Sequence, residues 1–374
     1  MRVAIDAMLL GGTHSGVEVA IEGLCAALPE AGGSKHYLIA HRAAYDASRL
    51  EGERVDALRA PGWASSRPGR IVWEHMALPG AARRWGARVL HGPGYVIPAR
   101  WKGPAVVTIY DVLALTHPQW CKWTNVVHYR RMLWASARAA DLVVTPSHTV
   151  KAQVTDILNV DAANVRVVPL GIHGAMRPVD AEAVARARQT YGLPRRYILW
   201  VGNIEPKKNV GAMVRAFEAA ASKIPHALVL AGRPAWRARR DLQMIAQSPF
   251  ASRIKALGYV PADVLPALYT GADLHVHWSL YEGAGLTPLE AMACGTCSVV
   301  SDGGALPELA GQHARVVPLG PPANLAEALV DALGHAGPTA RCSDAAQAWA
   351  QDHTWAQHAG QMNAVYEEVA GLAT

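Results

Sequence analysis

Short apolar runs alternate with segments of helical periodicity along the whole chain. Such alternation indicates an α/β protein whose strands form parallel sheets. In the first half the predicted strands are Val3–Ala7, Tyr37–Ala40, Val89–His91, Ala105–Ile109, Leu142–Thr145 and Val165–Val168. In the second half they are Tyr197–Val201, Ala227–Ala231, Ile254–Leu257, Leu274–His277 and Ser298–Ser301. The pattern predicts two doubly wound domains.

Length and composition agree with two domains. A chain of 374 residues exceeds the usual size of one domain, and 51% hydrophobic residues can fill two cores. The segment from Pro169 to Gly174 is the predicted hinge. The chain starts directly in a strand, and no apolar run reaches the roughly 18 residues of a membrane span. Five cysteines without a disulfide-like framework also favour a cytoplasmic protein.

Segment 281–295 places two carboxylates, Glu282 and Glu290, eight residues apart. Thr287 as N-cap and Gly295 just past the end predict a helix between them. Backbone N–H groups at the start of a helix attract an anion such as a phosphate. Glu290, three residues after Thr287, also fits a capping box, which would be a structural role.

Further motifs accompany this segment: Gly11-Gly12 with Gly16, Gly202 with Lys208-Asn209, Gly258-Tyr259-Val260-Pro261, and Gly303-Gly304-Ala305-Leu306-Pro307-Glu308-Leu309. With them, the chain resembles the mannosyltransferase-like group of the family 4 retaining glycosyltransferases, which have the GT-B fold. The resemblance implies two Rossmann-like domains facing a cleft. Residues 1–172 would bind the acceptor and residues 173–355 a nucleotide-sugar donor. A final helix, 356–374, would cross back to the first domain.

The resemblance implies a role for individual residues. Lys208 corresponds to the lysine that binds the donor diphosphate, and Glu282 to a contact of the transferred sugar. Glu290 corresponds to the residue that contacts the ribose hydroxyls of the donor. This role is the alternative to its capping-box interpretation. Asn203 stands where many members carry an arginine, so backbone N–H groups near Gly16 and in the loop after Glu282 would bind more of the phosphate charge. The remaining donor-binding residues implied are Gly232, Arg233, Tyr259, Val260, Gly283, Ala284, Gly285, Leu286 and Thr287.

The pair Tyr110-Asp111 departs from the His-Asp that the mannosyltransferase-like group usually carries after this strand. The resemblance places this pair at the catalytic site beside the donor sugar. A tyrosine adds bulk and does not titrate near neutral pH, so a sugar without a 6-hydroxyl becomes a candidate besides mannose. Packing is the alternative role for Tyr110. Ala284, where phenylalanine is common, is a second departure.

Other kinds of site fit less well. The N-terminal glycines lack the G-x-G-x-x-G spacing, and no acidic residue follows the second strand, which disfavours a dehydrogenase. No Asp-x-Asp stands at a strand end, so we expect no metal and no cofactor. His275 and His277 alternate on a strand without carboxylates nearby, which favours a structural role. Cys294 and Cys297 form a lone C-x-x-C, which favours packing over redox chemistry.

The formal net charge of +6 lies entirely in residues 1–170. The same half carries tryptophans among arginines, including Arg130-Arg131 beside Trp134. This combination suits an anionic membrane surface or a diphosphate-linked lipid. Core packing of the tryptophans with solvated arginines is the alternative, and no nucleic-acid-binding motif accompanies the charge.

These features predict a retaining, metal-independent glycosyltransferase. It would move a hexose or deoxyhexose, with mannose as one candidate, from a GDP- or UDP-linked donor to a glycan or lipid-linked acceptor. Two alternatives remain open: a degenerate GT-B protein acting as a non-catalytic binding subunit, and a GT-B epimerase or phosphorylase. The three departures from the family pattern favour the first alternative, whereas retention of Glu282, Glu290 and Lys208 counts against it.

Overall fold

The computed structural model describes residues 1–12, 15–50, 52–334 and 342–372. The chain divides into two compact units. Unit 1 comprises Met1–Gly171 and Thr354–Thr374, and unit 2 comprises Ile172–His353. The first boundary falls inside the predicted hinge, and the second lies two residues before the predicted boundary at 355.

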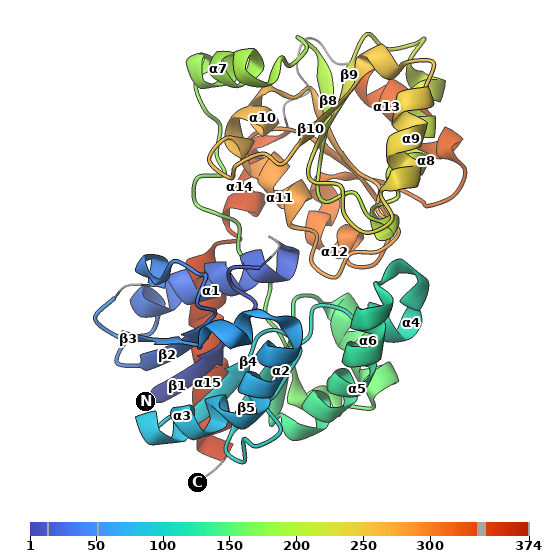
Figure 1. Ribbon diagram of the computed structural model, residues 1–374. Helices are drawn as coiled ribbons and strands as arrows, with labels where there is room; N and C mark the ends of the chain where they lie inside the picture. Colours follow the sequence, from blue (N-terminus) through green and yellow to red (C-terminus); the bar gives the residue numbers. More distant parts are fainter. Residues whose placement is uncertain (13–14, 51, 335–341, 373–374) are drawn as a thin grey trace. The chain divides into compact units, whose positions relative to one another are not determined.

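Unit 1 is built on a seven-stranded parallel sheet with the order β3-β2-β1-β4-β5-β6-β7 (Figure 1). The strand order turns back at β1, as in a doubly wound sheet, where ligands bind at the carboxyl ends of the strands. The strands are β1 (Arg2–Asp6), β2 (His36–His41), β3 (Val55–Arg59), β4 (Val89–Gly92), β5 (Ala105–Thr108), β6 (Leu142–Thr145) and β7 (Val165–Val167). The helices are α1 (Gly16–Ala31), α2 (Arg67–Met76), α3 (Leu78–Trp85), α4 (Leu113–Thr116), α5 (Trp123–Ala139), α6 (His148–Leu158) and α15 (Trp355–Leu372).

Unit 2 repeats this plan with a six-stranded parallel sheet of order β10-β9-β8-β11-β12-β13. Its strands are β8 (Tyr197–Val201), β9 (Ala227–Ala231), β10 (Ile254–Gly258), β11 (Leu274–His277), β12 (Ser298–Ser301) and β13 (Arg315–Val317). Its helices are α7 (Ala181–Tyr191), α8 (Val210–Ala220), α9 (Arg239–Gln247), α10 (Leu265–Gly271), α11 (Leu286–Ala293), α12 (Leu306–Ala310), α13 (Pro322–Gly334) and α14 (Asp344–Gln351). Strands β8, β9, β11 and β12 are buried along their whole length, as expected for a sheet covered on both faces.

The last helix, α15, belongs to unit 1 and packs against α1 (Figure 1). Met362 and Tyr366 of α15 are fully buried in the core of that unit. The ring of Trp355 covers Gly23 of α1 so closely that an added Cβ there would lie 2.2 Å from it. Helix α15 is therefore a structural part of unit 1, although it follows unit 2 in the sequence.

Two buried histidines, His91 in contact with α15 and His358 on α15 itself, predict a pH-dependent stability. Burial lowers the pKa of His91 to about 3, with a further contribution from His358, and burial lowers the pKa of His358 to about 4. Both folded pKa values lie below the unfolded value, so only the unfolded chain takes up protons as the pH falls below about 6.5. Stability should therefore fall by about 2 kcal/mol per histidine between pH 7.5 and pH 5.

Urea denaturation at pH 7.5, 6 and 5 would measure this loss. His91 contacts Tyr366 and Thr108 through its two ring nitrogens (2.8 and 2.9 Å), so His91→Gln keeps a polar side chain there while removing the titration. The variant should show a smaller loss between pH 7.5 and 5. Equal losses in both proteins would show that His91 does not contribute.

Candidate functional site

Helix α11 begins earlier than its sequence predicts. It starts at Leu286, after Gly285 in the left-handed conformation (φ 62°), and no side chain caps it. The prediction of Thr287 as N-cap was therefore wrong, because glycine in the left-handed region turns the chain into the helix two residues sooner. The hydroxyl of Thr287 instead lies 3.0 Å from His277 Nδ1. Gly295 does follow the helix in the left-handed conformation, as predicted.

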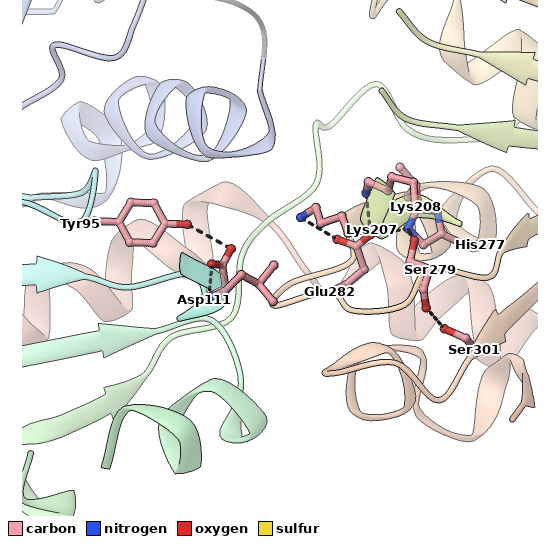
Figure 2. Close-up of polar contacts among 10 residues, drawn as sticks. Tyr95, Asp111, Lys207, Lys208, His277, Ser279, Glu282 and Ser301 are labelled. Atoms are coloured by element: carbon pink, nitrogen blue, oxygen red, sulfur yellow. Dashed lines mark hydrogen bonds and ion pairs between the residues drawn. The ribbon is translucent and has the colours of Figure 1, made fainter. Parts of the chain in front are cut away.

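Glu282 lies in the loop before α11 and is 6% exposed. Its Oε1 accepts hydrogen bonds from Lys208 Nζ at 2.6 Å and His277 Nε2 at 3.0 Å, while Lys207 Nζ lies 3.7 Å from Oε2 (Figure 2). The site therefore holds one buried carboxylate between two ammonium groups and an imidazole.

The electrostatics of this cluster fix its protonation. Burial alone would raise the pKa of Glu282, but Lys208, Lys207 and the hydrogen bond from His277 outweigh it and hold the pKa well below its usual range. Burial and the Lys208 ammonium lower the pKa of His277 despite its contact with Glu282. His277 is therefore neutral at pH 7. Because an ionised carboxylate only accepts, Nε2 carries the proton and Nδ1 accepts from Thr287.

The contact between His277 and Glu282 corrects the sequence analysis, which placed no carboxylate near this histidine. His277 ends β11 at the carboxyl edge of the sheet, and the loop after it returns Glu282 to its side. A histidine at the end of a buried parallel strand, five residues before a motif glutamate, was the signal that could have identified it. His275, by contrast, contacts Ser298 Oγ at 3.1 Å and is structural as predicted.

The loop that carries Glu282 is fastened to the segment of the second glycine motif. Ala305 N donates to Glu282 O (2.8 Å), and Glu282 N donates to Gly303 O (3.3 Å). Added Cβ atoms at Gly303 and Gly304 would lie 2.5 Å from Ser279 O and 2.4 Å from Glu282 O. The Gly303-Gly304 motif is therefore explained by the close approach of two backbones.

The lysines lie in a short 3-10 turn, η5 (Pro206–Lys208), that is tied to the same loop. Leu280 N donates to Lys207 O at 2.7 Å. Asn209 follows in the left-handed conformation (φ 56°) and starts α8. Asn203, two residues after the end of β8, is partly buried in the loop before this turn.

Glu290 lies in the middle of α11 and accepts a hydrogen bond from Tyr269 Oη at 2.8 Å. The capping-box interpretation is wrong, because Glu290 is the fifth residue of a helix that starts at Leu286. Burial raises the pKa of Glu290, although the bond from Tyr269 opposes the increase. A ribose hydroxyl would be a further donor to this carboxylate, so its predicted ribose contact stays a proposal.

Four predicted donor-binding residues follow β9 and β10. Gly232 N donates to Gly258 O at 2.7 Å, and a Cβ on Gly232 would lie 1.7 Å from Gly202 O. The guanidinium of Arg233 stacks 4.2 Å above the ring of Tyr259, which is exposed. Val260 is buried in the core, so its side chain does not face solvent. In the loop before α11, Gly283 is buried and Ala284 is partly buried, and Leu286, the first residue of the helix, is also partly buried.

Of the predicted residues of unit 1, Tyr110 and Asp111 follow the carboxyl end of β5, and Gly16 begins α1. Tyr110 is buried, its ring edge-on to Tyr95 at 5.6 Å, and burial raises its pKa well above its ordinary value. Asp111 accepts from Leu113 N (3.0 Å) and from Tyr95 Oη (3.3 Å; Figure 2). The burial of Tyr110 and its ring contact with Tyr95 favour the packing role for this residue. An added Cβ at Gly16 would meet open space.

Tyr95 is a residue that the sequence analysis missed. It has a left-handed backbone (φ 71°), which is costly for an aromatic residue and marks a constrained position. Its hydroxyl reaches Asp111, and its ring also packs on Tyr129 of α5 at 5.1 Å. No sequence motif signals this conformation.

Two family models match the chain. Residues 14–173 match "Glycosyltransferase Family 4", and residues 195–335 match "Glycosyl transferases group 1". The chain belongs to the family 4 glycosyltransferases. The first matched segment contains Gly16 and Asp111 of unit 1, and the second contains Glu282 and Glu290 of unit 2.

Relatives and solved structures agree with this family. The chain is 30% identical over 252 residues to the O-antigen chain mannosyltransferase B of Escherichia coli, covering 67% of this chain and 64% of the relative. It thus spans less than two thirds of that relative's length. The sucrose-phosphate synthase of Thermosynechococcus elongatus superposes with a TM-score of 0.80 at 19% identity, over 100% of both chains. The Anabaena protein Alr3699/HepE, in complex with UDP and glucose, gives 0.75 at 18% identity, over 98% and 99% of the two chains. The likeness assigns the GT-B fold to this family 4 member.

Proposed function

We propose that this protein is a retaining glycosyltransferase that moves a hexose or deoxyhexose from a nucleotide-diphosphate sugar to an acceptor. The observation that carries the proposal is the buried Glu282 carboxylate, held by Lys208 and His277 in a family 4 motif. Mannose is the first candidate sugar, because the Escherichia coli relative is named as a mannosyltransferase. GDP and UDP both remain candidates for the nucleotide.

The charges of the cluster suit a departing diphosphate. Lys207 and Lys208 bring two positive charges against the single negative charge of Glu282, so the cluster keeps a net charge of +1 with His277 neutral. A donor diphosphate would pair with the lysines and stabilise the negative charge that builds on the leaving group. It would also release Glu282 from Lys208, while His277 continues to orient the carboxylate toward the sugar.

A panel of nucleotide sugars tests the proposal. GDP-mannose, GDP-fucose, UDP-glucose and UDP-galactose would each be tested for thermal stabilisation of the protein and for release of the nucleoside diphosphate. One donor should stabilise the protein and be hydrolysed slowly without acceptor. Stabilisation without any turnover would favour the non-catalytic binding subunit, and interconversion of two sugar nucleotides would favour an epimerase.

We expect turnover to be independent of a divalent metal. Lys207 and Lys208 provide cations for the diphosphate, and among the described residues no three histidine, cysteine or acidic side chains gather as metal ligands. Activity in excess EDTA should therefore equal activity in untreated enzyme. Loss of turnover in EDTA that manganese restores would contradict this mechanism.

The acceptor is proposed to be a glycan or a lipid-linked glycan, approached at a membrane surface by unit 1. Among the described residues no helix is long and apolar enough to cross a bilayer. Trp123 (74% exposed), Trp63 (56% exposed), Val127, Val72 and Met76 are exposed apolar side chains of α2, α5 and the turn before α2. Other tryptophans of this half are not available to a membrane, because Trp73 and Trp101 are buried in the core.

Basic side chains accompany these apolar groups. Arg67 of α2 donates to the side chain and backbone of Thr124 on α5 (both 3.0 Å), which joins the two helices. Arg130 and Arg131 are exposed on α5. Exposed tryptophan beside arginine is the composition of a membrane-interface surface.

Replacing Arg130 and Arg131 with serine should weaken binding to anionic vesicles, at about 1 kcal/mol per arginine. Co-sedimentation with phosphatidylglycerol vesicles would measure this, and donor binding should not change. The matched control is Arg195→Ser with Arg196→Ser in unit 2, which removes the same charge. Negligible sedimentation of the wild type, or equal sedimentation of all three proteins, would favour a soluble glycan acceptor.

A further inference from the structure

We propose that a pocket between the starts of α8 and α9 is an accessory binding site for a small ligand that carries two or more phosphate charges. The two helices contact each other in unit 2 (Figure 1). The pocket has a volume of about 590 Å³, within the range of roughly 300–1,000 Å³ typical of small-molecule sites. Pro206 and Asn209, on either side of the two site lysines, line the pocket, whereas Glu282, Glu290 and Lys208 do not. The pocket therefore adjoins the proposed donor contacts but contains different charged groups.

Four arginines line this pocket: Arg215, Arg237, Arg239 and Arg240. No salt bridge joins them to a described residue, although Arg240 and Arg215 lie close enough to Asp241 to oppose the rise that burial causes in the pKa of its carboxyl group. The one carboxylate in the lining, Asp241, accepts a hydrogen bond from the backbone of Gly211. Four guanidinium groups against one carboxylate leave an excess of positive charge that a bound anion would neutralise. Arginine binds phosphate through paired N–H donors whose geometry matches the phosphate oxygens.

The ends of both helices add to this preference. Asn209 precedes α8 but its side chain donates to Trp278 O (3.4 Å) and does not cap the helix. Ala238 precedes α9 and has no capping group. Arg239 and Arg240 occupy the first turn of α9, where the helix dipole disfavours a cation. A phosphate bound here would offset the repulsion between these arginines and the helix dipole, because both the guanidinium groups and the N–H groups at the helix ends attract the anion.

The pocket is also preorganised. Arg237 has a left-handed backbone (φ 59°), a conformation that a non-glycine residue adopts at a cost and that clusters at ligand-binding sites. Its guanidinium is stacked over the ring of Trp236 at 4.4 Å, which restricts the side chain. Pro206, Ala212 and Met244 form an apolar part of the wall. The ligand therefore has room for an organic body beside its phosphates.

Calorimetry with inorganic pyrophosphate on the full chain tests the site. Arg239→Gln with Arg240→Gln should weaken binding at the pocket about tenfold or more, because two charge-assisted contacts are lost. The matched control is Arg195→Gln with Arg196→Gln, which removes the same charge beside the amino end of β8. The control should bind pyrophosphate as the wild type does. Equal weakening in both variants would reduce the effect to net charge and overturn the proposal.

The lysines of the proposed donor site can also bind pyrophosphate, so the two sites must be counted separately. In the wild type we expect two sites. Lys208→Ala should remove one and the pocket variant the other. If Lys208→Ala has no effect while the pocket variant does, the donor assignment fails and the accessory site stands. If only Lys208→Ala has an effect, the accessory site is wrong.

The phosphate source is a soluble molecule or a lipid headgroup, and vesicles distinguish the two. Phosphatidic acid vesicles would be tested in the Arg130→Ser, Arg131→Ser background, which removes the proposed membrane contact of unit 1. Binding that pyrophosphate displaces, and that the pocket variant lacks, assigns a lipid headgroup. Pyrophosphate binding without vesicle binding assigns a soluble ligand.

Discussion

Replacement of Glu282 by glutamine is expected to lower kcat/KM for sugar transfer by a factor of about 10² to 10³, the range for loss of one preorganised polar contact to the reacting centre. Glutamine keeps the size of the side chain and can still accept from His277 and Lys208, but it removes the negative charge. The buried carboxylate is ionised, because two ammonium groups and an imidazole hold its pKa low. The variant should therefore fold and should lose turnover rather than structure.

Donor affinity separates a catalytic from a structural role for Glu282. Lys208, freed from a carboxylate at 2.6 Å, should bind the donor diphosphate as tightly as in the wild type or more tightly. The control is Glu327→Gln on the exposed face of α13, which should change neither kcat nor KM. A Glu282→Gln variant with full turnover, or with donor binding lost in parallel with turnover, would contradict the assigned role.

The second large effect concerns nucleotide binding. Lys208→Ala removes the proposed charge-assisted contact to the diphosphate, and Glu290→Ala removes the proposed contacts to the ribose. Each should therefore weaken nucleoside diphosphate binding by roughly 1.5–3 kcal/mol. Calorimetry with GDP and UDP would measure both. Unchanged affinity for the preferred nucleotide in both variants would show that the site is assigned wrongly.

Truncated ligands assign each contact. Lys208→Ala should not affect binding of the nucleoside without phosphates. Glu290→Ala should cost little when the ligand is the 2′,3′-dideoxy nucleotide, because the hydroxyls that the carboxylate binds are already absent. Tyr269→Phe is the matched control, since it removes the hydrogen bond that Glu290 accepts within the protein while keeping the carboxylate.

The sequence predicted the sheets well because their central strands are continuous apolar runs. All eleven predicted strands occur, and five, including β8 and β11, have the predicted bounds. The two strands that it missed, β3 and β13, lie at the edges of their sheets. Their side chains are mostly exposed, so they carry no apolar run, and pairing with a neighbour forms them.

Sequence motifs selected Glu282, Lys208 and Glu290 as candidate site residues, and the structure brings Glu282 and Lys208 into contact. Their roles toward a donor stay predictions. The contacts of His277 were missed because they depend on how the loop after β11 folds back, which no local pattern records. The start of α11 was misplaced because Thr287 and Pro288 form a strong helix-start signal, whereas a left-handed glycine two residues earlier sets the boundary.

The central claim is that the chain transfers a sugar with retention of configuration, and NMR of the reaction with the preferred donor tests it most directly. For an α-linked donor and the wild-type protein, we predict that nucleoside diphosphate accumulates and that the first sugar product, before mutarotation, carries the α-anomeric signal. Neither signal should appear on the same time scale with Glu282→Gln. A β-anomer formed first would contradict the retaining mechanism. No nucleoside diphosphate release from any nucleotide sugar would contradict the assignment as a glycosyltransferase.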